Sequence, residues 1–195
     1  MGDRAGKLIV AVTGASGSVY AQRLLDLLDQ ASCQVHVVIS QPGKQVIAEE
    51  LGVGGFTAEA LIGRASENLT FHANSNLFSP IASGSYPINA AVVCPCSAHT
   101  LAAIAAGLAD TLLLRSVYVT LKERRPLILV PRESPVTAID LENMLKIARA
   151  GGIICPASPG FYAKPKSIAD LVDFVVARIL DLLHIEHSLP VRWKS

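Results

Sequence analysis

The chain has 195 residues, 17 basic and 16 acidic side chains, and a mean hydropathy of +0.42. With 51% hydrophobic and only 17% charged residues, it lacks the low hydrophobicity and high net charge of disordered chains. A formal net charge of +1 gives no electrostatic reason to expect nucleic acid or an anionic membrane as a partner. The length predicts a single domain over residues 1–195, with a polar C-terminal tail over 184–195.

The high hydropathy raises the question of a membrane span. Residues 68–109 contain no Asp, Glu, Lys or Arg, but Pro80, Pro87 and Pro95 interrupt them. A spanning helix needs about 20 apolar residues without such breaks. The apolar run at 8–12 is short for a signal peptide and leads into a glycine turn. We therefore expect a cytoplasmic protein whose surplus apolar residues are buried in a covered sheet or between subunits.

Taken in chain order, the apolar runs predict strands at 7–13, 34–40, 90–94, 126–131 and 153–155. Segments with helical spacing of apolar residues are predicted at 19–30, 44–51, 97–107, 110–124, 138–150 and 167–183. Ser167 is a good N-cap for the last helix. Residues 54–89 are rich in Ser, Asn, Gly and Pro and predict mostly loop.

Strands that alternate with helices indicate βαβ units and a parallel sheet. The strands are continuously apolar, so helices should cover both faces of that sheet. Right-handed crossovers then give a single-domain, three-layer α/β fold with a doubly wound parallel sheet, similar to the flavodoxin and Rossmann folds.

The four cysteines do not have the spacing of a zinc site, because no CxxC pair is present. We expect them to be reduced and mostly buried, and we predict no metal site.

In such folds, ligands bind beyond the carboxyl ends of the strands. All five predicted strand ends carry small, hydroxyl or charged residues, at 13–17, 40, 94–100, 131–135 and 156–162. This coincidence predicts a small-molecule site along one edge of the sheet.

The turn at 13–17 opens a helix, and its N–H groups and the helix dipole suit a phosphate. The turn is not a G-x-G-x-x-G fingerprint, and Ser40 stands where a dinucleotide site would need an acid. A tight turn that needs glycine explains it equally well. Likewise, Ser97 and Thr100 could cap the next helix or hold a ligand.

Charge is scarce in this chain, so charged residues near the strand ends are candidates for function. Arg132 and Glu133 could act in a site or form a surface ion pair. Arg115 and Arg178 lie in otherwise apolar helices and could pair with a carboxylate between subunits or bind phosphate. Glu50 could be a solvated helix end or could transfer protons.

Taken together, these motifs resemble one known family along nearly the whole chain. The matching motifs are Thr13-Gly-Ala-Ser-Gly17, Ser83-Gly-Ser85, Cys94-Pro-x-Ser-x-x-Thr-Leu-Ala102, Gly107-x-x-Asp110, Leu121-Lys-Glu-Arg-Arg-Pro126, Val130-Pro-Arg-Glu-Ser-Pro135, Leu141-x-Asn-Met-Leu145, Pro159-Gly-Phe-Tyr162 and the segment from Asp170 to Arg178. Through these motifs the chain resembles the UbiX-type flavin prenyltransferases.

The resemblance implies a flavodoxin-like homo-oligomer, typically a dodecamer, that needs no metal. It implies transfer of a dimethylallyl group from dimethylallyl monophosphate to reduced FMN, with bonds at the flavin N5 and C6. The prenylated FMN would then serve a partner decarboxylase of the UbiD type.

The resemblance also assigns residues. FMN-binding positions are Gly14, Ala15, Ser16, Ser40, Ser97, Ala98, His99, Thr100 and Arg132. Catalytic positions, tied to proton and leaving-group chemistry, are Ser16, Glu50 and Glu133. Substrate-binding positions are Lys122, Tyr162 and Arg178, with Arg115 as a further cation and Trp193 as a tail aromatic near the flavin. We expect one flavin to be surrounded by Glu50, Lys122, Arg132, Glu133 and Arg178.

Two departures from the family pattern lie on one predicted helix. Tyr118 stands where Asp is usual, which puts the usual subunit contacts in doubt, and Thr111 stands where Asn is usual.

Two other functions compete with prenyl transfer. The related FMN-dependent cysteine decarboxylases rely on a catalytic His, but no matching motif surrounds His36, His72 or His99. A non-catalytic flavin carrier would not need Glu50, Glu133 or the phosphate-binding set.

Overall fold

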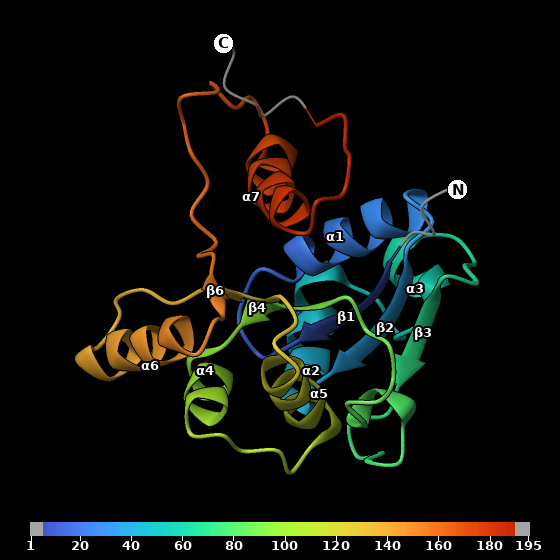
Figure 1. Cartoon of the computed structure of the whole chain (residues 1–195). Helices are drawn as coiled ribbons and strands as arrows, with labels where there is room; N and C mark the ends of the chain where they lie inside the picture. The colour runs from blue at the N-terminus through green and yellow to red at the C-terminus, as the bar shows by residue number, and fades with distance from the viewer. Residues whose placement is uncertain (1–5, 190–195) are drawn as a thin grey trace.

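A computed structural model describes residues 6–189, which form one six-stranded parallel sheet with helices on both faces (Figure 1). The strands are β1 (Lys7–Val12), β2 (Gln34–Ile39), β3 (Leu69–His72), β4 (Ala90–Cys96), β5 (Leu127–Pro131) and β6 (Ile153–Ile154). The helices are α1 (Ser18–Gln30), α2 (Gln41–Leu51), α3 (Ala58–Ile62), α4 (Ala98–Ala105), α5 (Leu112–Lys122), α6 (Ala138–Arg149) and α7 (Ile168–Leu182), and a 3-10 turn, η1, covers Pro80–Ala82.

The strand order is β3-β2-β1-β4-β5-β6, so the predicted doubly wound parallel sheet is confirmed. Two strands follow β1 on one side and the chain then crosses to β4 on the other side. The order reverses between β1 and β4, and this switch point opens a crevice at the carboxyl ends of the two strands.

Apolar side chains of alternating direction build a core on each face of the sheet. Val10 and Val37 face α1 and α7, whereas Ile9 and Ala11 face α4 and α5. Figure 1 shows α1 and α7 on one side of the sheet and α4 and α5 on the other. Strand β4 is buried along its whole length, which explains its unbroken apolar sequence.

Residues 54–89, predicted as mostly loop, contain α3, β3 and η1, so the prediction of five strands was wrong by one. Strand β3 has only four residues and lies at the sheet edge, where Leu69 pairs with Val35 of β2. Its strand conformation depends on this pairing, and the short sequence carries no periodic signal of its own.

The tail prediction can be followed only as far as residue 189. Ile185 and Leu189 pack against the core on the α1 and α7 side, and the ring of His187 lies 3.2 Å from Asp181. This part of the tail is therefore packed against the body. Trp193 lies outside the described residues, and the extent of the single domain stays a prediction.

The cysteine prediction is confirmed. All four thiols are free, and Cys33, Cys94 and Cys96 are buried. Burial raises the pKa of Cys96 to about 12 and raises that of Cys94 still further, so both remain thiols at neutral pH. None of the helices within residues 6–189 is long and apolar enough to cross a membrane.

Candidate functional site

A cavity of about 350 Å³ lies at the carboxyl ends of β1, β2 and β4, at the switch point of the sheet. Five of the sequence-predicted residues line it, namely Gly14, Ser40, Ser97, His99 and Thr100. The remaining lining residues are Gln41, Pro42, Asn74, Ala103, Thr111, Leu113 and Leu114. The structure thus brings the loops after β1, β2, β3 and β4 and the start of α5 around one small space.

One side of the cavity depends on a close approach between the β1 loop and α2. A Cβ atom on Gly14 would lie 2.5 Å from the Cβ of Pro42, so only glycine fits there without movement. Ser40 begins α2 by accepting a hydrogen bond from the Gly43 N–H at 3.0 Å. Ser40 therefore acts as a helix cap and also lines the cavity.

The start of α4 forms another side. The Ser97 hydroxyl accepts the Thr100 N–H at 3.2 Å and donates to the Thr100 hydroxyl at 3.0 Å, so the capping interpretation is confirmed. Helix geometry leaves the first-turn N–H groups of Ala98 and His99 without intrahelical acceptors. Because these groups lie at a helix N-terminus beside the cavity, they can bind an anion there.

The start of α1 is different, because a protein carboxylate already occupies it. Glu50 accepts hydrogen bonds from the Gly17 N–H at 3.0 and 3.1 Å and from the Ser18 N–H at 2.7 Å. Partial burial raises the pKa of Glu50, but hydrogen bonds from Ser16, Ser18 and Gly17 outweigh it and hold this pKa below its ordinary value. These N–H groups, which the sequence suggested for a phosphate, are engaged by an ionised side chain.

Arg132 and Glu133 do not face each other as a surface pair. The Arg132 Nε donates to the carbonyl oxygen of Ser16 at 3.1 Å, which joins the loop after β5 to the turn after β1. Glu133 is exposed and accepts the Ser134 N–H at 3.2 Å. Ser16, Glu50 and Arg132 are therefore neighbours, and the guanidinium of Arg132 keeps its other N–H groups for a ligand.

The predicted substrate cations lie elsewhere on the chain. Lys122 ends α5 and pairs with Glu123 at 3.1 Å. The same helix begins beside the cavity, and its 11 residues extend over about 15 Å, given a rise of about 1.5 Å per residue. Arg115 lies nearer the cavity and donates from Nε to the Ala82 carbonyl oxygen at 3.2 Å.

Arg178 and Tyr162 belong to the opposite side of the sheet. Arg178 is an exposed residue of α7 and pairs with Asp181 at 3.0 Å. The exposed Tyr162 ring packs edge-on against Phe174 of the same helix, with 5.5 Å between ring centroids. The expectation that all the charged candidates surround one flavin is therefore not met within a single chain.

Asn74 and Thr111 line the cavity but were not predicted as site residues. The Asn74 carbonyl oxygen accepts the Leu112 N–H at 2.8 Å, and its side-chain oxygen accepts the Leu113 N–H at 2.9 Å. Thr111 caps the same helix by accepting the Leu114 N–H at 3.3 Å. Asn, which is usual at position 111 in the family, and Thr are both good N-caps, so Thr111 keeps the capping role. Asn74 caps a helix 38 residues later, and so distant a contact leaves no local sequence signal.

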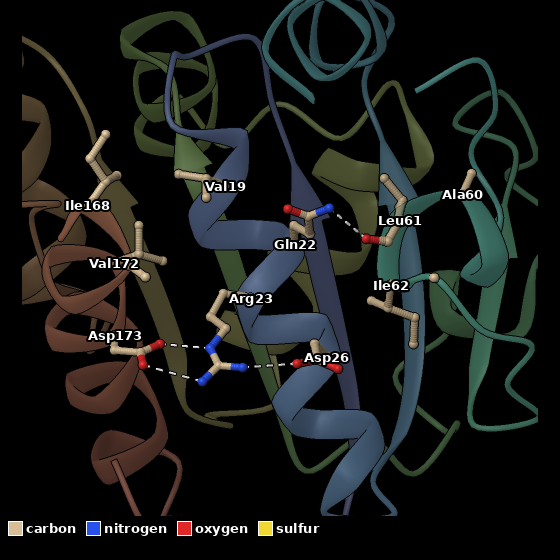
Figure 2. A pocket seen from close by; sticks show the side chains of 12 residues that line it. Val19, Gln22, Arg23, Asp26, Ala60, Leu61, Ile62, Ile168, Val172 and Asp173 are labelled. Carbon is tan, nitrogen blue, oxygen red and sulfur yellow. Dashed lines mark hydrogen bonds and ion pairs between the residues drawn. The ribbon is translucent and has the colours of Figure 1, made fainter. Parts of the chain in front are cut away.

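A larger groove of about 790 Å³ lies between α1, α3 and α7 (Figure 2). Its charged groups already bind one another, because Arg23 contacts Asp173 at 2.7 Å and Asp26 at 3.0 Å. Gln22 donates to the Leu61 carbonyl oxygen at 2.8 Å. None of the sequence-predicted site residues lines this groove. The smaller cavity at the switch point is therefore the better candidate site.

The comparisons with known proteins identify the family of this chain. The flavoprotein family model matches residues 2–180. The chain is 46% identical to the flavin prenyltransferase UbiX of Methanocaldococcus jannaschii, over 96% of this chain and 98% of that protein. The structure of AnUbiX in complex with FMN and dimethylallyl pyrophosphate is 37% identical, with a TM-score of 0.90, and the match covers 98% of this chain and 99% of that one.

A second solved structure is a dodecameric FMN-dependent UbiX-like decarboxylase from Escherichia coli O157:H7. It is 39% identical, with a TM-score of 0.88, and the match covers 97% of this chain and 100% of that one. High identity over nearly full length, together with the shared fold, confirms the family that the motifs indicated. The chain belongs to the flavoprotein family and, within it, to the UbiX flavin prenyltransferases.

Proposed function

We propose that this protein transfers a dimethylallyl group from dimethylallyl monophosphate to reduced FMN, with new bonds at the flavin N5 and C6. The prenylated flavin is then passed to a decarboxylase of the UbiD type. The observation that carries this proposal is the cavity at the switch point, which the starts of α2 and α4 frame with hydroxyl groups and free N–H groups. Relatives named flavin prenyltransferases support it.

The residues present fit FMN. A phosphate would bind at the start of α4, with the N–H groups of Ala98 and His99 and the hydroxyls of Ser97 and Thr100 as donors. Gly14 brings backbone without a side chain to the cavity, and Ala15 follows it in the same turn. Arg132 would add a positive charge from the loop after β5. When bound and reduced, the flavin supplies the electron-rich nucleophile, so the chain needs only to position the reactants.

Ser16 and Glu50 form the proposed proton-handling pair. The Ser16 hydroxyl hydrogen-bonds to Glu50, and N–H groups of α1 hold the carboxylate in place. Because its pKa is lowered, Glu50 is ionised at neutral pH and can accept the proton lost when the flavin carbon is alkylated. Glu133, exposed at the same edge of the sheet, is the proposed partner in leaving-group chemistry.

The departing phosphate needs cations, which we assign to Lys122, Arg178 and Arg115, with Tyr162 as a hydroxyl donor. These side chains are exposed and lie on different sides of one chain. A single substrate phosphate can contact several of them only if neighbouring copies contribute to one site. We therefore propose a homo-oligomer, a dodecamer like the Escherichia coli neighbour, with substrate sites between subunits.

One experiment separates this function from its alternatives. The purified protein is incubated without oxygen with FMN, a reductant and dimethylallyl monophosphate, and the flavin mass is then measured. An increase by one prenyl unit supports the proposal. Carbon dioxide release from a cysteinyl substrate would instead support a cysteine decarboxylase. Tight FMN binding with neither reaction would support a flavin carrier.

A further inference from the structure

Thr13 is a buried hydroxyl residue between two of the loops that form the cavity. It follows β1 directly and is 1% exposed. Its hydroxyl donates to the Pro95 carbonyl oxygen at 2.8 Å and accepts the Ser97 N–H at 2.8 Å. The Thr13 N–H also reaches the Pro95 carbonyl oxygen, at 3.3 Å. One side chain therefore uses both its donor and its acceptor capacity on the loop that leads into α4.

The groups that Thr13 holds decide where α4 begins. Ser97 is the N-cap of α4, and its own hydroxyl binds Thr100. An N-cap residue's N–H points away from the helix and needs a partner outside it. Thr13 supplies that partner, so the position of the α4 start relative to β1 depends on the Thr13 hydroxyl.

The next residue of the same turn is fixed against another loop. Gly14 packs against Pro42 at the start of α2, and the Ser40 N–H binds the Val12 carbonyl oxygen at 2.9 Å. The Ser40 N–H at the α2 start thus binds the backbone of β1, whereas the Ser97 N–H at the α4 start binds the Thr13 side chain.

We propose that Thr13 is a positioning residue for the flavin phosphate, which sets the distance between the α4 N-terminus and the turn at Gly14. The inference rests on the proposed binding of FMN in this cavity. Thr13 does not line the cavity, so its effect on FMN passes through Ser97 and the first turn of α4.

Three substitutions of Thr13 separate the effect of its hydroxyl from the effect of its side-chain volume. Thr13→Val keeps the shape and removes the hydroxyl, and Thr13→Ala lacks it as well, whereas Thr13→Ser keeps it and loses only a methyl group. Thr120→Val is the matched control, because Thr120 is also 1% exposed and its hydroxyl donates to the Ser116 carbonyl oxygen at 2.8 Å. That bond lies within α5, away from the α4 start.

The dissociation constant of FMN is measured by quenching of flavin fluorescence, well below the thermal midpoint of each variant. We expect at least tenfold weaker binding for Thr13→Val and Thr13→Ala, and binding within about threefold of the original chain for Thr13→Ser, since about 1.4 kcal/mol corresponds to a factor of ten. Thr120→Val should lose stability and keep its FMN affinity.

Equal FMN affinity of Thr13→Val, Thr13→Ala and Thr13→Ser would overturn the inference. It would also be overturned if Thr120→Val lost as much FMN affinity as Thr13→Val, because the weaker binding would then reflect a general loss of stability. If Thr13→Val does not fold, the comparison of Thr13→Ala with Thr13→Ser gives the same answer. Failure of the unmodified protein to bind FMN would instead refute the proposed function.

Discussion

The cavity at the switch point and the surface around α6 are built in opposite ways. At the cavity, loops from three strands interlock through buried contacts such as those of Thr13 and Gly14. Around α6, by contrast, Ile147 is the one buried residue of a twelve-residue helix. The exposed large apolar residues on this helix and just before it are Val136, Ile139, Leu141 and Leu145.

This difference shows which part of the site one chain can complete. The proposed flavin-binding half is completed by contacts within the chain. Helix α6 exposes the large apolar side chains of Ile139, Leu141 and Leu145, and the proposed phosphate-binding cations lie on separate exposed elements. The proposed oligomer would cover the apolar side chains of α6 and bring the cations together in one site.

The largest expected effect comes from breaking the assembly. Replacement of Ile139 and Leu145 by Glu places two charges in the apolar surface of α6, where the side chains are 69% and 49% exposed. We expect a smaller particle by size-exclusion chromatography with light scattering, and at least a hundredfold loss of prenyl transfer. The isolated chain should keep its fold, because neither residue is part of the core.

Gln30→Glu, at the exposed end of α1, is the control and should leave particle size unchanged. If the α6 variant assembles and reacts as the original protein does, the apolar surface of α6 is not a subunit contact that the site needs.

The next effect concerns the cations. Lys122→Ala should lower the turnover by about a hundredfold to a thousandfold, as loss of one transition-state donor does, and Arg132→Ala should lower it through weaker FMN binding. Lys122 ends α5, whereas Arg132 binds the turn at Ser16. We assign the two residues to different chains of one site, so mixed oligomers that contain both variants should recover measurable activity. Mixing Lys122→Ala with the double variant is the control, since no complete site can form. Absence of recovery in correctly assembled mixtures would place both residues in the same chain's site.

Glu50→Gln should have an effect of similar or smaller size on turnover. Loss of a general base costs about a hundredfold or more, and FMN affinity should change much less, since Glu50 is not on the cavity lining. Loss of the carboxylate at the start of α1 should also cost about 1 kcal/mol of folding free energy. Its neighbour Glu49→Gln, also exposed, is the matched control. Unchanged turnover in Glu50→Gln would remove Glu50 from the chemistry.

The smallest expected effect is on stability and lies outside the site. His36 binds His72 at 2.9 Å and the Tyr86 hydroxyl at 3.1 Å, and His72 binds Ser79 at 3.0 Å. Burial, His72 and Lys7 lower the pKa of His36 to about 4. The unfolded chain takes up a proton near pH 6.5, so the stabilisation is present above that pH and is lost as the pH falls towards 4.

Denaturant unfolding at several pH values checks this prediction. The free energy of unfolding should fall between pH 6.5 and about 4, and the fall should be smaller in His36→Gln. Equal slopes for the two proteins would mean that His36 does not titrate differently on folding.

The sequence predicts the layers of this fold well and its edges poorly. Continuous apolar runs identify buried strands such as β1 and β4, since both faces of the sheet are covered. Strand β3 was missed because its four residues form a strand only through pairing with β2. The half of the site at the strand ends follows from topology, and this logic located Ser40 and Ser97.

Other parts of the site could not be derived in this way. Asn74 acts through a helix that begins far along the chain, and Glu50 reaches the start of α1 from the end of α2. Such contacts depend on how elements pack and not on local pattern. Lys122 was assigned to the site through the family resemblance, whereas Arg178 was already a candidate as a cation in an apolar helix. Neither residue lines the cavity of its own chain.

The most direct test of the account is a single turnover with reduced FMN bound to the purified protein and dimethylallyl monophosphate in excess. Inorganic phosphate and flavin mass are measured in the same sample. We predict one phosphate released for each flavin that gains a prenyl unit, with the reaction limited by the amount of bound FMN. Phosphate release without prenylated flavin, or unchanged flavin in a folded, FMN-loaded protein, would contradict the assignment.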